Sequence, residues 1–212
     1  MSSAMEGSSI ESPEGLLQGD PALAPEADLA LAVRLLEAYG PVDAAQVEMR
    51  RRMLDFIAEH PENAHRRTCL EGHLTASALV LDAAGERALL LHHRKLGKWL
   101  QMGGHCDGDA NLPGVALRES EEESGIEGLR VLPRIVDLDI HEIPARPGEP
   151  AHLHLDTRYF VLAPEGAEPV RNHESNALRW FGLEEALDEV EDVSLRRLLR
   201  LRLADSDEEY SR

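Results

Sequence analysis

Apolar residues recur at helical spacing in two segments near the start of the chain. The first segment leads into a Gly-Pro pair at 40–41. In the second, Met49, Met53 and Ile57 are four residues apart, and Pro61 follows. Apolar side chains at this spacing share one face of a helix. We therefore expect two amphipathic helices, the second with the more regular period.

A hairpin and a short strand are expected next. Residues 74–81 and 88–93 read LTASALVL and ALLLHH, and a turn that contains Gly85 separates them. Short β-rich runs on either side of such a turn are typical of a β-hairpin. Residues 98–102 (KWLQM) predict a further strand, which leads directly into the glycines at 103–104.

Residues 112–124 predict a helix that ends at a glycine. Leu112, Val115 and Ala116 lie on one side of this helix, and its charged residues lie on the other. Gly125 follows the last of them. Glycine is common just past a helix end because it adopts a left-handed backbone conformation without strain.

The rest of the chain predicts strands followed by helices. Residues 129–143 and 152–162 alternate apolar and polar side chains, and 178–183 is one more strand candidate. Helices are expected at 184–190 and 194–203. Because the strands do not alternate strictly with helices, the order favours a mixed sheet packed with helices over a doubly wound parallel fold.

The chain is strongly acidic. Its 22 Lys and Arg residues oppose 40 Asp and Glu residues, which gives a net charge of −18. Such a charge disfavours nucleic acid as a partner. Residues 1–26 are rich in Ser, Pro, Gly and Ala without apolar periodicity, so we expect a disordered or loosely attached acidic arm there and an acidic tail at 205–212.

The cysteine count and hydropathy indicate a cytoplasmic protein. Cys69 and Cys106 are too few for a disulfide framework, and they lack the paired spacing of a zinc site. No apolar run reaches the roughly 18 residues of a membrane span. The acidic start also lacks the positively charged and apolar parts of a signal peptide.

Three carboxylates are expected to converge on the helix at 112–124. Glu119 and Glu123 are four residues apart and share a face, and Glu122 lies one residue round from it. Like charges at this spacing repel, so a multivalent cation would relieve the arrangement. Oxygen ligands of this kind suit Mg²⁺ or Mn²⁺. A solvated acidic helix face is the alternative interpretation.

The surrounding segment resembles the signature of the Nudix hydrolases. Residues 103–126 read GGHCDGDANLPGVALRESEEESGI, and the signature is G-x5-E-x7-R-E-U-x-E-E-x-G-U, where U is a bulky aliphatic residue. Ala110 stands where the first Glu belongs, and Ser120 replaces the aliphatic residue. The matching residues are Gly104, Arg118, Glu119, Glu122, Glu123, Gly125 and Ile126.

The resemblance implies a fold and a metal site. The fold is a Nudix-type α/β/α sandwich with a mixed sheet over 72–204, preceded by a helical extension at 27–71. The implied metal ligands, direct or through water, are the backbone carbonyl of Gly104 and the carboxylates of Glu119, Glu122 and Glu123. Arg118 would pair with and orient a neighbouring carboxylate.

The implied activity is hydrolysis of a pyrophosphate bond in a nucleoside diphosphate linked to another moiety. A divalent ion lowers the pKa of the attacking water and neutralises charge on the phosphoryl oxygens. Glu122 and Glu174 are both candidates for the base. The alternative is a Nudix-like module that binds a nucleotide or sugar phosphate without hydrolysing it. The N-terminal helices would serve either activity as a homodimer interface or a substrate lid.

Four further residues are candidate substrate contacts. Arg94 and Lys98 belong to a dense basic cluster just before the glycines, which would attract a polyphosphate. His105 follows the glycines directly. Asp156 belongs to an alternating set with His152 and His154, which lie on one strand face and could contact substrate or hold a second metal.

Overall fold

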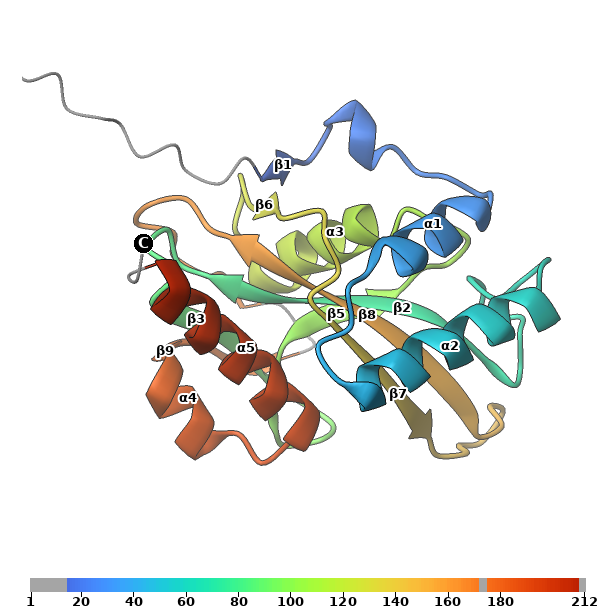
Figure 1. The fold of residues 1–212 in the computed structure, drawn as a ribbon. Coiled ribbons are helices and arrows are strands. Elements are labelled where there is room, and N and C mark those ends of the chain that lie inside the picture. Colours follow the sequence, from blue (N-terminus) through green and yellow to red (C-terminus); the bar gives the residue numbers. More distant parts are fainter. Residues whose placement is uncertain (1–14, 172–174, 210–212) are drawn as a thin grey trace, which may run out of the picture.

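A mixed sheet lies between two layers of helices in the computed structural model (Figure 1). The structure describes residues 15–171 and 175–209 of the 212-residue chain. Nine strands of this part of the chain belong to the one sheet. The predicted α/β/α sandwich is therefore confirmed, and two helices precede its first long strand.

The elements follow one another in the order helices, strands, central helix, strands, helices. The strands are β1 (Leu16–Leu17), β2 (Gly72–Leu81), β3 (Arg87–His93), β4 (Trp99–Leu100), β5 (Met102–His105), β6 (Arg130–Val131), β7 (Asp137–Ile143), β8 (His152–Leu162) and β9 (Ser175–Gly182). The helices are the 3-10 turn η1 (Pro21–Leu23), α1 (Ala30–Ala38), α2 (Ala44–Glu59), α3 (Leu112–Ser124), α4 (Leu183–Glu189) and α5 (Val193–Glu209).

The longest pairing in the sheet joins β2 and β8, which run parallel. Gly72 lies opposite Leu153, and the register continues unbroken to Leu81 opposite Leu162. The other pairings are antiparallel: β5 and β3 take different stretches of β2, while β7 and β6 take different stretches of β8. β2 thus has neighbours on both edges and fixes the positions of the strands around it.

Alternate side chains of β2 enter two separate hydrophobic cores. Ala76, Ala78 and Val80 pack in the cluster that contains the buried residues of α1, α2 and α3. Leu79 and Leu81 pack in the cluster that contains those of α4 and α5. Because successive strand residues point to opposite faces, the sheet divides the helices into two layers.

The prediction of a loose arm over residues 1–26 is wrong for its described part. β1 pairs with β6, and Leu23 is buried. The Nδ2 group of Asn111 donates to the carbonyl oxygens of Ala22 and Ala24, at 2.9 Å each. These contacts attach residues 15–26 to the start of α3. Residues 1–14 lie outside the described residues.

Two predicted strands are interrupted in the structure, and one helix is longer than predicted. The strand expected at 98–102 is interrupted at Gln101, so β4 ends at Leu100 and the glycines become part of β5. The strand expected at 129–143 divides into β6 and β7. The predicted acidic tail at 205–212 begins inside α5, which continues to Glu209. Residues 210–212 lie outside the described part.

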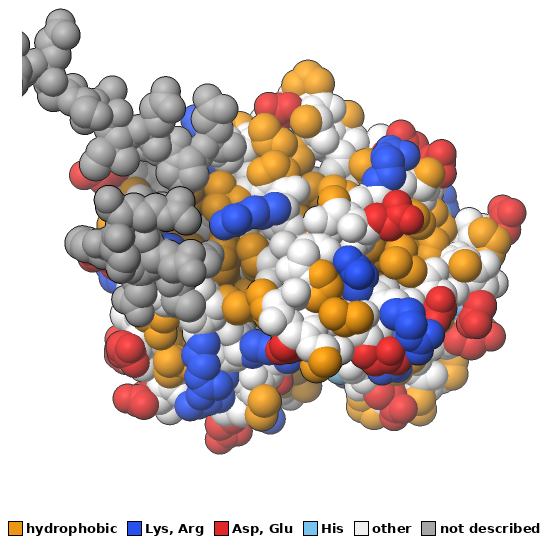
Figure 2. All heavy atoms as spheres, in the orientation of Figure 1, with side chains coloured by type: hydrophobic (Ala, Val, Ile, Leu, Met, Phe, Trp, Pro, Cys, Tyr) orange, Lys and Arg blue, Asp and Glu red, His pale blue; other side chains and the backbone are white. Residues whose placement is uncertain are grey.

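Charged side chains are mixed on the face of the molecule that Figure 2 shows. Lys and Arg side chains are scattered among acidic ones there and form no continuous basic surface. This pattern gives no support to nucleic-acid binding on that face. Among the described residues, the helices are too short or too polar to cross a membrane.

Candidate active site

α3 is positioned by a buried apolar face and a glycine at its end. Leu112, Val115 and Ala116 are fully buried against the sheet. Gly125 has a φ of 64°, the left-handed conformation expected of a helix C-cap, and its N–H donates to the carbonyl oxygen of Glu121. The predicted helix and its end are confirmed, and the helix presents its acidic residues near β5.

β5 approaches α3 through its two glycines. The N–H of Gly103 donates to Oε2 of Glu123, at 2.9 Å. A Cβ atom on Gly104 would collide with the carboxylate of Glu119. A side chain at position 104 would therefore force this carboxylate to shift from its present place. The structure thus brings Gly104, Glu119 and Glu123 together, as the signature implied.

Arg118 lies between two carboxylates. Its Nη2 lies 3.5 Å from Oε1 of Glu119, and its Nη1 lies 3.4 Å from Oδ2 of Asp109. Oδ1 of Asp109 also accepts hydrogen bonds from the backbone N–H groups of Glu26 and Asn111. Asp109, which directly precedes Ala110, therefore holds Arg118 in place.

The two departures from the signature are accommodated by the fold. Ala110 is fully buried, and its N–H donates to the carbonyl oxygen of Glu26 at 2.5 Å. Ser120 is also fully buried, and its hydroxyl donates to the carbonyl oxygen of Ala116 at 2.7 Å. Each position is packed and hydrogen-bonded, so neither departure disrupts the loop or the helix.

The environment of Glu119 on α3 disfavours its charged form when no cation is bound. Burial raises the pKa of Glu119 above its ordinary value, and the charge of Glu122 adds to the rise, while Arg118 opposes it. Glu122 is exposed and Glu123 half-buried. The groups offered are hard oxygens close to a backbone carbonyl, which is a donor set that fits Mg²⁺ or Mn²⁺.

Asp156 does not have the environment expected of a substrate contact. It is 4% exposed, and it accepts hydrogen bonds from the hydroxyls of Thr75 at 3.0 Å and Ser77 at 2.7 Å. Nε of Arg158 lies 3.0 Å from its Oδ2. Its carboxylate therefore joins β8 to β2 within the sheet, and the prediction of a substrate contact is corrected.

The predicted basic residues lie in the turn between β3 and β4. Arg94 and Lys98 are both exposed. Nζ of Lys98 lies 3.9 Å from Oε2 of Glu191, in the connection between α4 and α5. Lys98 thus contacts the layer of helices on the other side of the sheet from α3. Glu174, the second candidate base, lies outside the described residues.

His105 belongs to a group of histidines that sequence reasoning found only in part. The predicted alternation places His152 and His154 side by side, with ring centroids 5.3 Å apart. His73 of β2 joins them, since its ring lies 5.0 Å from that of His152 and 5.1 Å from that of His154. His73 alternates with the polar Thr75 and Ser77 along β2, but this pattern alone does not show which strand lies beside it.

Burial favours the neutral form of three of these imidazoles, those of His73, His105 and His154. It lowers the pKa of His105 to about 4, with a further contribution from the charge of Arg67, and it lowers the pKa of His154 to about 2, with a further contribution from the neighbouring histidines. It also lowers the pKa of His73. Neutral imidazole nitrogens are acceptors and metal ligands at neutral pH.

Comparison with known proteins places this geometry among related folds. Residues 72–201 match the NUDIX domain. A C. elegans Ap4A hydrolase binary complex is similar to 63% of this chain and 97% of its own, at 20% identity and a TM-score of 0.52. The E. coli dihydroneopterin triphosphate pyrophosphohydrolase is similar to 59% of this chain and 91% of its own, at 19% identity and a TM-score of 0.48. The M. smegmatis Nudix hydrolase RenU is similar to 64% of this chain and 88% of its own, at 24% identity and a TM-score of 0.48.

Proposed function

Because this chain belongs to the NUDIX domain family, we propose that it cleaves a pyrophosphate bond with the help of Mg²⁺ or Mn²⁺. The family assignment indicates a hydrolase. The proposed substrate is a nucleoside diphosphate linked to another moiety, such as a nucleoside diphosphate sugar or ADP-ribose. Such compounds carry the diphosphate that a divalent ion bridges to protein carboxylates.

One observation supports this proposal most strongly: Glu119 and Glu123 of α3 meet the glycine backbone of β5. The N–H of Gly103 fixes the carboxylate of Glu123, and the lack of a side chain at Gly104 leaves room for Glu119. The backbone carbonyl of Gly104 and the carboxylates of Glu119, Glu122 and Glu123 are the proposed ligands. A divalent ion bound there would neutralise phosphate charge and make water a better nucleophile.

The remaining roles belong to residues around the carboxylates. Arg118 holds Glu119 in place through the contact at 3.5 Å, and Asp109 holds Arg118 from the other side. Glu122 is exposed beside them, so we propose that it accepts the proton of the attacking water. Glu174 is a second candidate for this role.

The first experiment is a substrate panel with a metal control. The panel contains nucleoside diphosphate sugars, ADP-ribose, NADH, coenzyme A, nucleoside triphosphates and Ap4A, the last because the C. elegans relative is named for it. Product release is measured with Mg²⁺, with Mn²⁺ and with a chelator. We expect metal-dependent cleavage of at least one member. Binding of a member without cleavage under all conditions would contradict the proposal and favour a non-hydrolytic binding module.

A further inference from the structure

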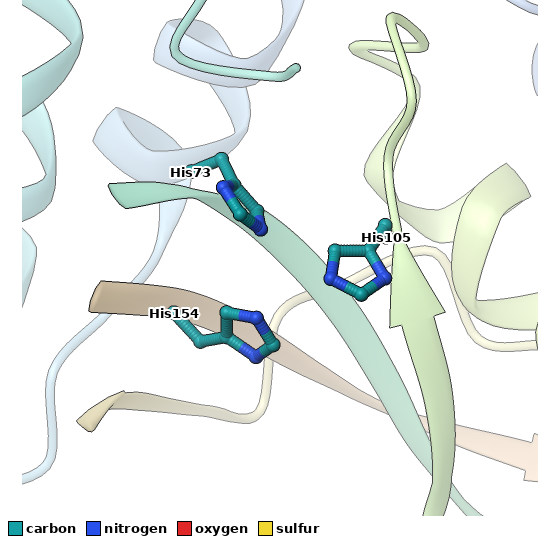
Figure 3. A group of neighbouring side chains, drawn as sticks. All are labelled: His73, His105 and His154. Atoms are coloured by element: carbon teal, nitrogen blue, oxygen red, sulfur yellow. The ribbon is translucent and has the colours of Figure 1, made fainter. Parts of the chain in front are cut away.

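Three imidazole rings from three different strands converge on one point (Figure 3). They belong to His73 of β2, His105 at the end of β5, and His154 of β8. The ring centroids form a nearly equilateral triangle with sides of 5.1, 5.1 and 5.0 Å. One nitrogen of each ring lies within 4.8 Å of the corresponding nitrogens of the other two.

Strand register holds the three residues in place. The parallel pairing sets His73 directly opposite His154. The antiparallel pairing sets His105 opposite Thr75, two residues along β2 from His73 and on the same face. All three residues thus project from paired backbone, which is a rigid base for a binding site.

Several nitrogens of this group are buried without a hydrogen-bond partner. His73 is 3% exposed, and both of its ring nitrogens lack a hydrogen bond with the described residues. The same holds for Nε2 of His154. Leaving a buried polar atom unpaired is unfavourable, and a ligand bound to these nitrogens would remove that cost.

We propose that His73, His105 and His154 bind a transition-metal ion, for which Zn²⁺ is the best fit. Neutral imidazole is a preferred zinc ligand, and three protein ligands leave a fourth position for water or a further ligand. Zinc–nitrogen distances of about 2.0–2.1 Å place tetrahedral ligand nitrogens about 3.4 Å apart, so each ring needs to move inward by less than about 1 Å.

This site differs from the carboxylate site in position and chemistry. Gly104 faces Glu119, whereas the next residue, His105, projects to the opposite face of the sheet. The carboxylate site offers oxygen and suits Mg²⁺, while the histidine site offers only nitrogen and suits Zn²⁺. The proposal therefore does not depend on the hydrolase activity, and the two ions are not expected to compete.

A second group of potential ligands provides the competing hypothesis. One ligand atom each from His60, Cys69 and Glu71 also lies within a 4.8 Å range. The side chain of Glu71 is 72% exposed, and Nδ1 of His60 lies 3.9 Å from its Oε2. A flexible exposed carboxylate makes this the weaker site, and a variant at Cys69 distinguishes the two.

The test is zinc binding by the full chain after removal of bound metals. The protein is treated with a chelator, freed of it, and dialysed against Zn²⁺ with Mg²⁺ in excess, and the zinc is counted by elemental analysis. We expect about one equivalent of Zn²⁺ per chain. His105→Ala and His154→Ala should lose it, while His92→Ala, which removes a histidine of β3 outside the group, should retain it.

A second measurement keeps the test sharp if a variant folds poorly. Co²⁺ replaces Zn²⁺, and the visible absorption of the complex reports its coordination, with circular dichroism as the check on folding. A tetrahedral spectrum that is lost in folded His105→Gln supports the proposal. The proposal is overturned if zinc binding survives in His105→Ala and His154→Ala, or if it disappears in Cys69→Ser. It is also overturned if the unmodified chain binds no zinc. Glu123→Gln should bind Zn²⁺ normally.

Discussion

Asp109 holds Arg118 from the side opposite Glu119, with Oδ2 of the acid 3.4 Å from Nη1 of the guanidinium. Asp109 directly precedes Ala110, the position where the signature has its first Glu. The carboxylate that the sequence lacks at 110 is therefore available one residue earlier. It reaches Arg118 because its other oxygen is fixed by the N–H groups of Glu26 and Asn111.

The first prediction concerns this carboxylate. Asp109→Asn keeps an oxygen acceptor for the two N–H groups but removes the charge that faces Arg118. We expect turnover to fall by about 10- to 100-fold, as for residues that orient metal ligands, with little loss of stability. Steady-state kinetics and thermal unfolding measure the two effects. Asp107→Asn is the matched control, since Asp107 is exposed and pairs with Arg67. Equal losses in both variants would argue against the role of Asp109.

The second prediction concerns the acids of α3. Glu122→Gln and Glu123→Gln preserve side-chain volume and remove a ligand charge, so turnover should fall by at least about a hundredfold while the fold remains intact. Glu121→Gln changes a neighbouring acid of the same helix, whose charge interacts with Glu127 instead. It should remain active. Full activity in both ligand variants would show that the metal site has been assigned to the wrong residues.

The third prediction concerns the contact between β5 and α3. Gly104→Ala places a methyl group where the Glu119 carboxylate lies, so this carboxylate must move. We expect a large loss of turnover and a higher requirement for Mg²⁺. The control is Gly40→Ala, because a Cβ atom there meets nothing within 4 Å. Metal titrations of activity provide the measurement, and an unchanged Mg²⁺ requirement in Gly104→Ala would contradict the proposed geometry.

The fourth prediction concerns the N-terminal segment. Leu23 is 7% exposed and packs in the core that contains α3, whereas Leu17 is 36% exposed. Leu23→Ala should lower the free energy of unfolding by about 2–4 kcal/mol, the usual cost of truncating a buried leucine. Leu17→Ala should change it much less. Urea denaturation measures both, and equal effects would mean that the segment does not contribute to the core.

The fifth prediction concerns pH. A hydrogen bond to Asp139, 3.0 Å away, raises the pKa of His141 above its ordinary value of 6.5. The folded state then gains stability from protonated His141 below pH 6.5 and loses that gain as the pH rises through the raised pKa. His141→Ala should therefore destabilise the protein at acidic pH and be nearly neutral at alkaline pH.

The size of this effect is limited by solvent. The side chain of His141 is 45% exposed, so we expect a difference of less than about 1 kcal/mol between the two conditions. Unfolding is measured in metal-free buffer on either side of neutrality. His92→Ala serves as the control. A destabilisation by His141→Ala that grows with rising pH would have the wrong sign and would reject the role of the pair.

Elements with a regular period could be predicted from the sequence. The spacing of Met49, Met53 and Ile57 predicted α2, and Gly125 predicted the end of α3, because both signals depend on residues close together in the chain. The resemblance implied that Gly104, Glu119 and Glu123 belong to one site, and the structure places them close together. These features are local or are fixed by a motif whose parts are close in sequence.

Features that depend on distant pairing could not be predicted. His73 carries no motif of its own and joins His154 only because β2 pairs in parallel with β8. Asp156 was expected to contact substrate, but buried hydroxyls of β2 and Arg158 surround it. Residues 15–26 lack apolar periodicity, so the sequence does not show that they are held in place. The side-chain amide of Asn111 attaches them to the start of α3.

The parallel pairing of β2 with β8 also determines when the sheet can form during folding. Thr75 and Asp156, a bonded pair across these strands, are 81 residues apart. Contacts over such separations form late and slow folding, because a long loop must close first. During synthesis, β2 has no partner on that edge until the ribosome has released β8. This edge of β2 thus stays unpaired while the segment between Leu81 and His152 is made, and the three-histidine group cannot assemble before β8 is available.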